Sequence, residues 1–314
     1  MISPAAGMSL KDWLLLYVLS AVWSSSFFFV SIVVHELPPL LTAACRMGLA
    51  ALIVTSITLA SGRRLPMRRG ILAAFLFMGF LSAAMPSWLS AISQTQITSG
   101  LASILNATTP IWTVLLAHLL TTDEKITPNR LSGVLLGLLG MAIMLAPDLL
   151  AITAGIGLGP LFGQGAMLLC ALFVAVAGIF GRRFHRLGLP VTVTTSGQLC
   201  SAAFFLVPAA LIVDRPWMLD LPSARTIAAL FGLALISTVA ASLLYFRVLA
   251  RAGSNVNLVT LLVPINSVLL GVLFLGERLE PRHLLGMAAI AAGLIAIDGR
   301  LVQWAARQMR ARFG

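Results

Sequence analysis

Long apolar runs fill almost the whole of this 314-residue chain and constrain its fold more than any other feature. A helix needs about 20 apolar residues to cross the hydrocarbon core of a membrane. Ten runs reach that length and only short segments connect them, so we expect ten transmembrane helices. The runs span approximately 12–34, 39–60, 70–92, 97–120, 129–147, 160–181, 190–213, 225–250, 254–275 and 283–302.

The composition excludes most classes of soluble protein. Hydrophobic residues make up 59% of the chain and charged residues only 10%, whereas a soluble domain carries roughly 25% charged residues. Too few charges remain to cover the surface of a water-soluble globule. Three cysteines, an odd number without metal-ligand spacing, predict buried thiols and no metal site. We expect an all-α membrane protein surrounded by membrane lipid, with no cofactor.

The net charge of +11 is concentrated in the segments that connect the apolar runs. Because cytoplasmic loops are enriched in lysine and arginine, this distribution places both termini in the cytoplasm. The basic residues follow no nucleic-acid-binding motif, so we expect no nucleic-acid partner. The segments predicted to face the cytoplasm hold Lys11, Arg63, Arg64, Arg68, Arg69, Lys125, Arg130, Arg182, Arg183, Arg186, Arg251, Arg300, Arg307, Arg310 and Arg312.

The two halves of the chain share a pattern of proline, acid and two glycines. A proline opens similar segments in the fourth and ninth runs, an acidic residue follows each, and two glycines seven residues apart follow each acid. Because each half contains five spans, the halves cross the membrane in opposite directions, as in many secondary transporters. We therefore divide the chain into a first five-helix repeat, 1–150, and a second, 151–314, with a short basic tail. The matched residues are Pro110, Glu124, Gly133 and Gly140 in the first half and Pro264, Glu277, Gly286 and Gly293 in the second.

Further short motifs resemble a known family of transporters. The first run contains Trp23-Ser24-Ser25-Ser26-Phe27, the second carries Arg46, and the ninth ends in Leu275-Gly276-Glu277-Arg278-Leu279. Together with the doubled pattern, these motifs resemble the drug/metabolite transporter superfamily, in its EamA branch, over essentially the whole chain. Within that branch the chain is most similar to bacterial aromatic amino-acid exporters. The resemblance implies a multi-pass transporter in the bacterial inner membrane.

Each half presents a polar stripe beside its proline. Positions three and four apart share one helical face, and a proline inside a helix frees a backbone carbonyl. We expect the two stripes to line a central cavity and the helices to bend at the prolines during gating. The alternative interpretation is that small polar residues only join helices. The substrate-binding candidates are Ser103 and Asn106 in the first half and Asn257 and Thr260 in the second, beside the gating candidates Pro110 and Pro264.

Aromatic, thioether and hydroxyl side chains in the first, third and eighth runs complete the predicted cavity. Aromatic and thioether groups form an adaptable apolar wall for a bulky side chain. The alternative interpretation is that these residues face lipid or pack in the core. The candidates are Trp23, Met78, Ser82, Met85, Trp88 and Tyr245.

Charged side chains are almost absent from the middle of the runs. Arg46 is the exception, and its alternative interpretation is a side chain that extends to the outer interface. A nucleotide or sugar phosphate would require several interior cations, so we expect a neutral or zwitterionic substrate such as an amino acid. A quaternary amine would require an acidic or aromatic cage, of which only the aromatic residues are present.

We predict export of amino acids, aromatic or other bulky neutral ones, by alternating access through a central cavity and without ion coupling. The alternatives are export of other drugs or metabolites, such as quaternary amines or small neutral metabolites, and a channel. An enzyme is not expected, because no nucleophile, base or set of metal ligands converges at one depth. Gly133 and Gly137 predict a close helix contact, within the chain rather than in a dimer. Both a monomer and a homodimer remain open.

Overall fold

The computed structural model describes residues 10–121, 125–153, 158–185, 188–252, 256 and 258–298. In these ranges the chain is helical and contains no strand. Within the described ranges, nine helices are long and apolar enough to cross a membrane, and a shorter apolar helix spans Val259–Leu275. The helices therefore follow the ten predicted runs, with one of them shorter than expected.

The helices of the first half begin and end within a few residues of the predicted bounds, except at the end of the fifth. The second helix begins and ends where the apolar run does, at Pro39 and Ala60, while the fifth extends six residues past its predicted end at 147. The elements are α1 (Leu10–Val33), α2 (Pro39–Ala60), α3 (Arg69–Gly79), η1 (Phe80–Ala84), α4 (Met85–Ser93), α5 (Ser99–Asn106), α6 (Thr109–Leu120) and α7 (Pro128–Thr153).

The second half repeats the succession of long and interrupted helices. The elements are α8 (Gly159–His185), α9 (Val191–Val213), η2 (Pro216–Met218), α10 (Ala224–Ala234), η3 (Leu235–Ala240), α11 (Ala241–Ala252), α12 (Val259–Leu270), η5 (Gly271–Leu275) and α13 (Pro281–Asp298).

In the part of the chain that the structure describes, three of the spans contain a π-helical stretch. In the third and eighth spans η1 and η3 connect two α-helical segments, and η5 ends the ninth span. A π-helical turn widens the backbone spiral by one residue and is found often at functional sites. The interruptions in the third and eighth spans lie at corresponding positions of the two halves.

The fourth span departs from the expected continuous helix. The α-helix ends at Asn106 and a new one begins at Thr109, so Pro110 lies in the first turn of α6. Proline is tolerated in a first turn, because its missing N–H has no partner there in any case. Pro264, in contrast, lies inside α12.

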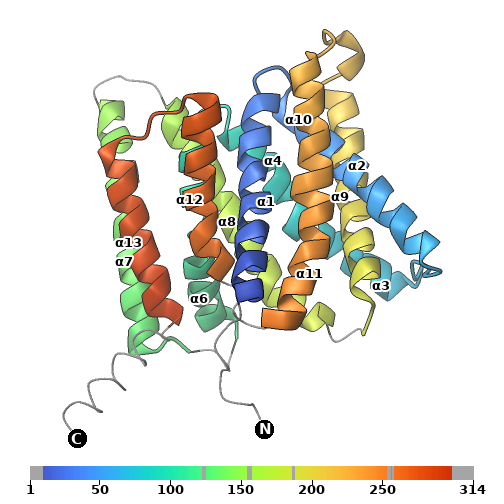
Figure 1. Cartoon of the computed structure of the whole chain (residues 1–314), viewed down its shortest axis with the longest axis horizontal. Coiled ribbons are helices and arrows are strands. Elements are labelled where there is room, and N and C mark those ends of the chain that lie inside the picture. The colour runs from blue at the N-terminus through green and yellow to red at the C-terminus, as the bar shows by residue number, and fades with distance from the viewer. Residues whose placement is uncertain are drawn as a thin grey trace, which may run out of the picture.

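Charged side chains divide between the two ends of the helix bundle. α1, α7 and α12 run from one end to the other, and α2, α10 and α13 return (Figure 1). Leu10 and Asp298 therefore lie at the same end; the predicted cytoplasmic termini themselves lie outside the described residues. We call this the basic end, with Lys11, Arg63, Arg64, Arg68, Arg69, Lys125 and Arg130, beside which Asp12 also lies. We call the opposite one the acidic end; it carries most of the acidic residues, Glu36, Asp148, Asp214, Asp220, Glu277 and Glu280, together with Arg215, Arg225, Arg278 and Arg282.

Glycines bring α7 and α13 into direct backbone contact. A Cβ atom added at Gly140 would lie 2.7 Å from the carbonyl oxygen of Gly286, and one added at Gly133 would overlap that of Gly293. The contact is intramolecular, as predicted, and the two helices lie side by side at one edge of the bundle (Figure 1). We call this contact the α7–α13 seam.

Candidate functional site

An aromatic pair lies between the first and eighth spans. Trp23 of α1 stacks on Tyr245 of α11, with ring centroids 5.6 Å apart and planes 24° from parallel. Both rings are half-buried and pack against the largest apolar cluster, as does Met85 of α4. The structure therefore pairs two of the predicted substrate-binding residues, Trp23 and Tyr245, and packs a third, Met85, against the same large apolar cluster.

Hydroxyl and amide groups join α1 to the second half at the same level of the bundle. The Ser24 hydroxyl donates to the carbonyl of Val263 over 2.8 Å, and the hydroxyls of Ser25 and Ser237 lie 2.8 Å apart. The Asn266 amide donates to Ser20 over 2.7 Å. We call these contacts the α1–α12 interface, including the bond to η3. Asn266 was missed from the sequence, although an asparagine in an apolar helix was itself a signal.

The two polar stripes do not form one open surface. Ser103 is fully buried and its hydroxyl donates to Gly100 of its own helix over 2.7 Å. Asn106 is half-buried where α5 ends, and Thr260 is half-buried at the start of α12. Asn257 lies outside the described residues. Because the fourth span is interrupted after Asn106, its stripe does not continue along a single helix.

The residues predicted in the third span separate into different surroundings. Trp88 packs against the alanine-rich cluster between α2 and α9, away from the cluster around Trp23. Met78 is buried next to Gly181 near the basic end of α8. The Ser82 hydroxyl donates to the carbonyl of Met78 over 2.6 Å. Each of these contacts also fits a purely structural role.

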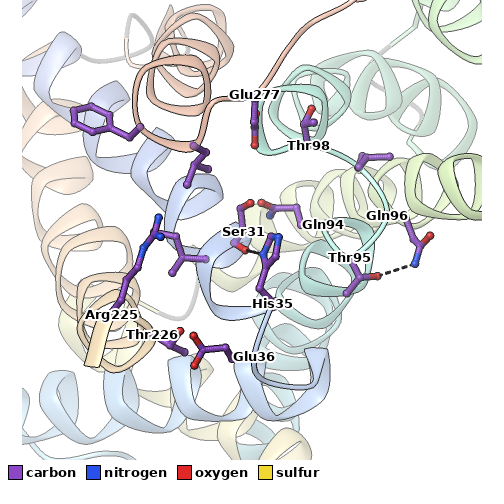
Figure 2. A pocket seen from close by; sticks show the side chains of 14 residues that line it. Ser31, His35, Glu36, Gln94, Thr95, Gln96, Thr98, Arg225, Thr226 and Glu277 are labelled. Carbon is purple, nitrogen blue, oxygen red and sulfur yellow. Dashed lines mark hydrogen bonds between the residues drawn. The ribbon is translucent and has the colours of Figure 1, made fainter. Parts of the chain in front are cut away.

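A cavity of about 650 Å³ opens at the acidic end. None of the predicted site residues that the structure describes lines it. Figure 2 shows the Gln94 amide pointing toward Ser31, between Glu277 on one side and Arg225 on the other. The lining residues are Ser31, Ile32, His35, Glu36, Gln94, Thr95, Gln96, Ile97, Thr98, Arg225, Thr226, Phe274, Leu275 and Glu277.

Carboxylates at the acidic end bind the backbone N–H groups of helix N-termini. Glu277 accepts from Ser99 over 2.7 Å and from Gly100 over 3.0 Å, at the start of α5. Glu36 accepts from the backbone and hydroxyl of Ser223 before α10, each over 2.7 Å. The backbone hydrogen bond from Ser223 lowers the pKa of the Glu36 carboxyl. A helix N-terminus favours a negative charge, so these carboxylates have structural partners.

The described residues contain no group of His, Cys, Asp and Glu side chains that could hold a metal ion. Their acidic residues lie at or near helix ends and in connecting segments. Among the described residues, the interior contains aromatic rings, hydroxyls, amides and one arginine, Arg46.

Comparisons with known proteins match most of the chain to membrane transporters. The EamA-like transporter family matches residues 11–146 and 161–297. The chain is 27% identical to the Escherichia coli uncharacterized inner membrane transporter YedA, over 90% of this chain and 89% of that protein. It is 25% identical to a probable amino-acid metabolite efflux pump of Escherichia coli, over 91% and 94% of the two chains. A solved crystal structure shares the fold with a TM-score of 0.63 and 19% identity, over 91% of this chain and 96% of that one.

Proposed function

The chain belongs to the EamA-like transporter family, and from this premise we propose that it exports amino acids with aromatic or other bulky neutral side chains. It is a multi-pass protein of the bacterial inner membrane. The observation that carries the substrate proposal is the stack of Trp23 on Tyr245 inside the bundle. Aromatic faces provide apolar area with a defined orientation for a bulky side chain. A relative bearing the name probable amino-acid metabolite efflux pump supports the same class.

Two antiparallel halves, 1–150 and 151–314, form the proposed architecture. The two matched family segments fall one within each half. Gly133 corresponds to Gly286 and Gly140 to Gly293, and Gly133 approaches Gly293 while Gly140 approaches Gly286. Reciprocal contacts of this kind are expected between two copies related by a twofold axis. The interruptions η1 and η3 at corresponding positions add support.

The acidic end is the outer end in this proposal, because lysine and arginine concentrate at the basic end. The 650 Å³ cavity then forms the outer vestibule of the transport path. Described carboxylates occur at helix ends and in connecting segments, so we infer export that needs no proton carrier in the membrane interior. Alternating access would involve rocking of the two halves about the interior aromatic pair.

Transport by the full-length protein in proteoliposomes tests this function. We expect saturable flux of L-phenylalanine, slower flux of L-threonine, and no dependence on a pH gradient. Trp23→Ala removes one face of the stack and should lower kcat/KM for L-phenylalanine about tenfold. Trp217→Ala is the matched control, because Trp217 is 70% exposed in η2. Its flux should equal that of the wild type.

Three outcomes would contradict the proposal in different ways. Absence of amino-acid flux in folded protein would reject the substrate class and favour other metabolites. Strict dependence on the proton gradient would reject uncoupled export. Continuous single-channel current would replace the carrier by a channel.

A further inference from the structure

Arg46 lies deeper in the bundle than the other basic residues that the structure describes. It is seven positions after Pro39, where α2 begins at the acidic end. Its Nε donates to the Thr238 hydroxyl over 3.0 Å. Thr238 lies fourteen positions after the start of α10, which also begins at the acidic end. The side chain therefore extends toward the middle of the bundle, away from the nearest interface, which argues against the alternative of an interface anchor.

The partners of Arg46 do not balance its charge. Thr238 is a neutral acceptor, and its own hydroxyl proton is donated to Leu233 over 2.9 Å. The ion pairs among the described residues are Arg251 with Asp12 and Arg282 with Asp148 and Glu280, and Arg46 takes part in none of them. A cation inside a membrane protein is costly without a counter-charge.

The guanidinium group still has donors to offer. It carries five N–H bonds in a planar fork, and the bond to Thr238 occupies one. Its terminal nitrogens make no hydrogen bond with the described residues and are not among the polar atoms that the protein fully encloses. Arg46 itself is half-buried. α2 and η3 thus hold a fork whose outer donors are available.

We propose that Arg46 binds the carboxylate of the transported solute and that Thr238 holds the guanidinium in position for it. The inference rests on the proposed amino-acid export. It specifies that the carboxylate end of the solute contacts Arg46. A planar fork matches a carboxylate with two parallel hydrogen bonds. A solute with a free carboxylate supplies the missing counter-charge, whereas its amide or amine analogue does not. The binding site therefore selects zwitterions and carboxylates over cations of the same shape.

Selectivity between L-phenylalanine and L-phenylalaninamide tests this role in proteoliposomes. We expect L-phenylalaninamide to inhibit transport by the wild type only weakly. Arg46→Gln should raise the KM for L-phenylalanine at least tenfold and leave this weak inhibition unchanged. Arg46→Lys, which keeps the charge and loses the fork, should give an intermediate KM. Thr238→Val should raise the KM for L-phenylalanine a few-fold. Thr238→Ser keeps the hydroxyl and should have a KM close to that of the wild type, as expected of a positioning residue. Arg247→Gln is the matched control, because it removes one positive charge from an exposed position on α11.

Thermal unfolding of the detergent-solubilised protein, titrated with both probes, provides a readout that is independent of transport. L-phenylalanine should stabilise the wild type more than the amide does, and Arg46→Gln should abolish this difference. If the wild type transports L-phenylalanine but Arg46→Gln keeps its selectivity, or loses both solutes equally, the role of Arg46 is wrong and the export proposal stands. If the wild type neither transports nor is stabilised by L-phenylalanine, both proposals are wrong.

Discussion

The α7–α13 seam and the α1–α12 interface hold the bundle together by different physical means. In the seam, glycines bring backbone against backbone, and among the described residues a side-chain bond from Arg282 to Asp148 over 3.1 Å joins the two helices near their acidic end. At the α1–α12 interface, hydroxyl and amide groups join α1 to its neighbours, beside the π-helical turn η3. Interlocked backbones allow little sliding, whereas hydrogen bonds between small polar groups can exchange partners. The seam therefore fits a fixed frame and the interface a region that changes during transport.

The largest expected effect comes from breaking the seam. Gly133→Val would place a branched side chain against the carbonyl of Gly293, and both helices would have to separate. Overpacking of this kind typically costs 1–3 kcal/mol. The Ile297 side chain could shift, but the backbone of Gly293 and Ile297 on the other side cannot, so we expect a loss of about 3 kcal/mol or more. Thermal unfolding and the yield of monodisperse protein measure it.

Gly178→Val serves as the control for this substitution. Gly178 lies on α8, with open space where a Cβ atom would be placed. Its stability should stay close to that of the wild type. Equal stability of the two variants would show that the seam is not a rigid frame.

Removal of the carboxylate that joins the ninth span to α5 should have an intermediate effect. Glu277→Gln loses the charge that accepts from Ser99 and Gly100. Hydrogen bonds to charged groups contribute roughly 1.5–3 kcal/mol, and Glu277 is only half-buried, so we expect a loss of about 2 kcal/mol in unfolding free energy. Asp220→Asn removes one negative charge from an exposed position at the same end and should change stability little. A loss of equal size in both variants would mean that net charge, and not the helix cap, is responsible.

The smallest effect is expected at the α1–α12 interface. Ser24→Ala removes a buried hydroxyl that donates to Val263. Hydrogen bonds between membrane helices contribute on average about 0.6 kcal/mol, so stability should fall by about that amount. Ser26→Ala, at the third serine of the same motif, is the neighbouring control, and its stability should stay close to that of the wild type. A loss at Ser24 as large as that at Gly133 would remove the distinction between frame and moving region.

The residues predicted for the site show where local reasoning was sufficient and where it ended. Trp23, Tyr245 and Met85 pack around the same cluster, because an aromatic or thioether group away from a helix end tends to face the bundle. Trp88 also faces the bundle, but it packs against the cluster between α2 and α9 and not against the cluster around Trp23. Periodicity specifies which face of a helix is apolar or polar; it does not specify which neighbouring helix that face meets.

The sequence by itself determined the number, the approximate bounds and the doubled pattern of the helices, because hydropathy and the requirement to satisfy backbone hydrogen bonds in lipid act within each span. The tertiary structure alone decided that Glu277 binds the start of α5, that Arg46 reaches Thr238, and that a cavity opens beside Gln94. Glu277 and Arg46 lie more than 150 positions along the chain from these partners. The side chain that meets a given N–H or hydroxyl is set by how the helices pack together, which no local pattern encodes.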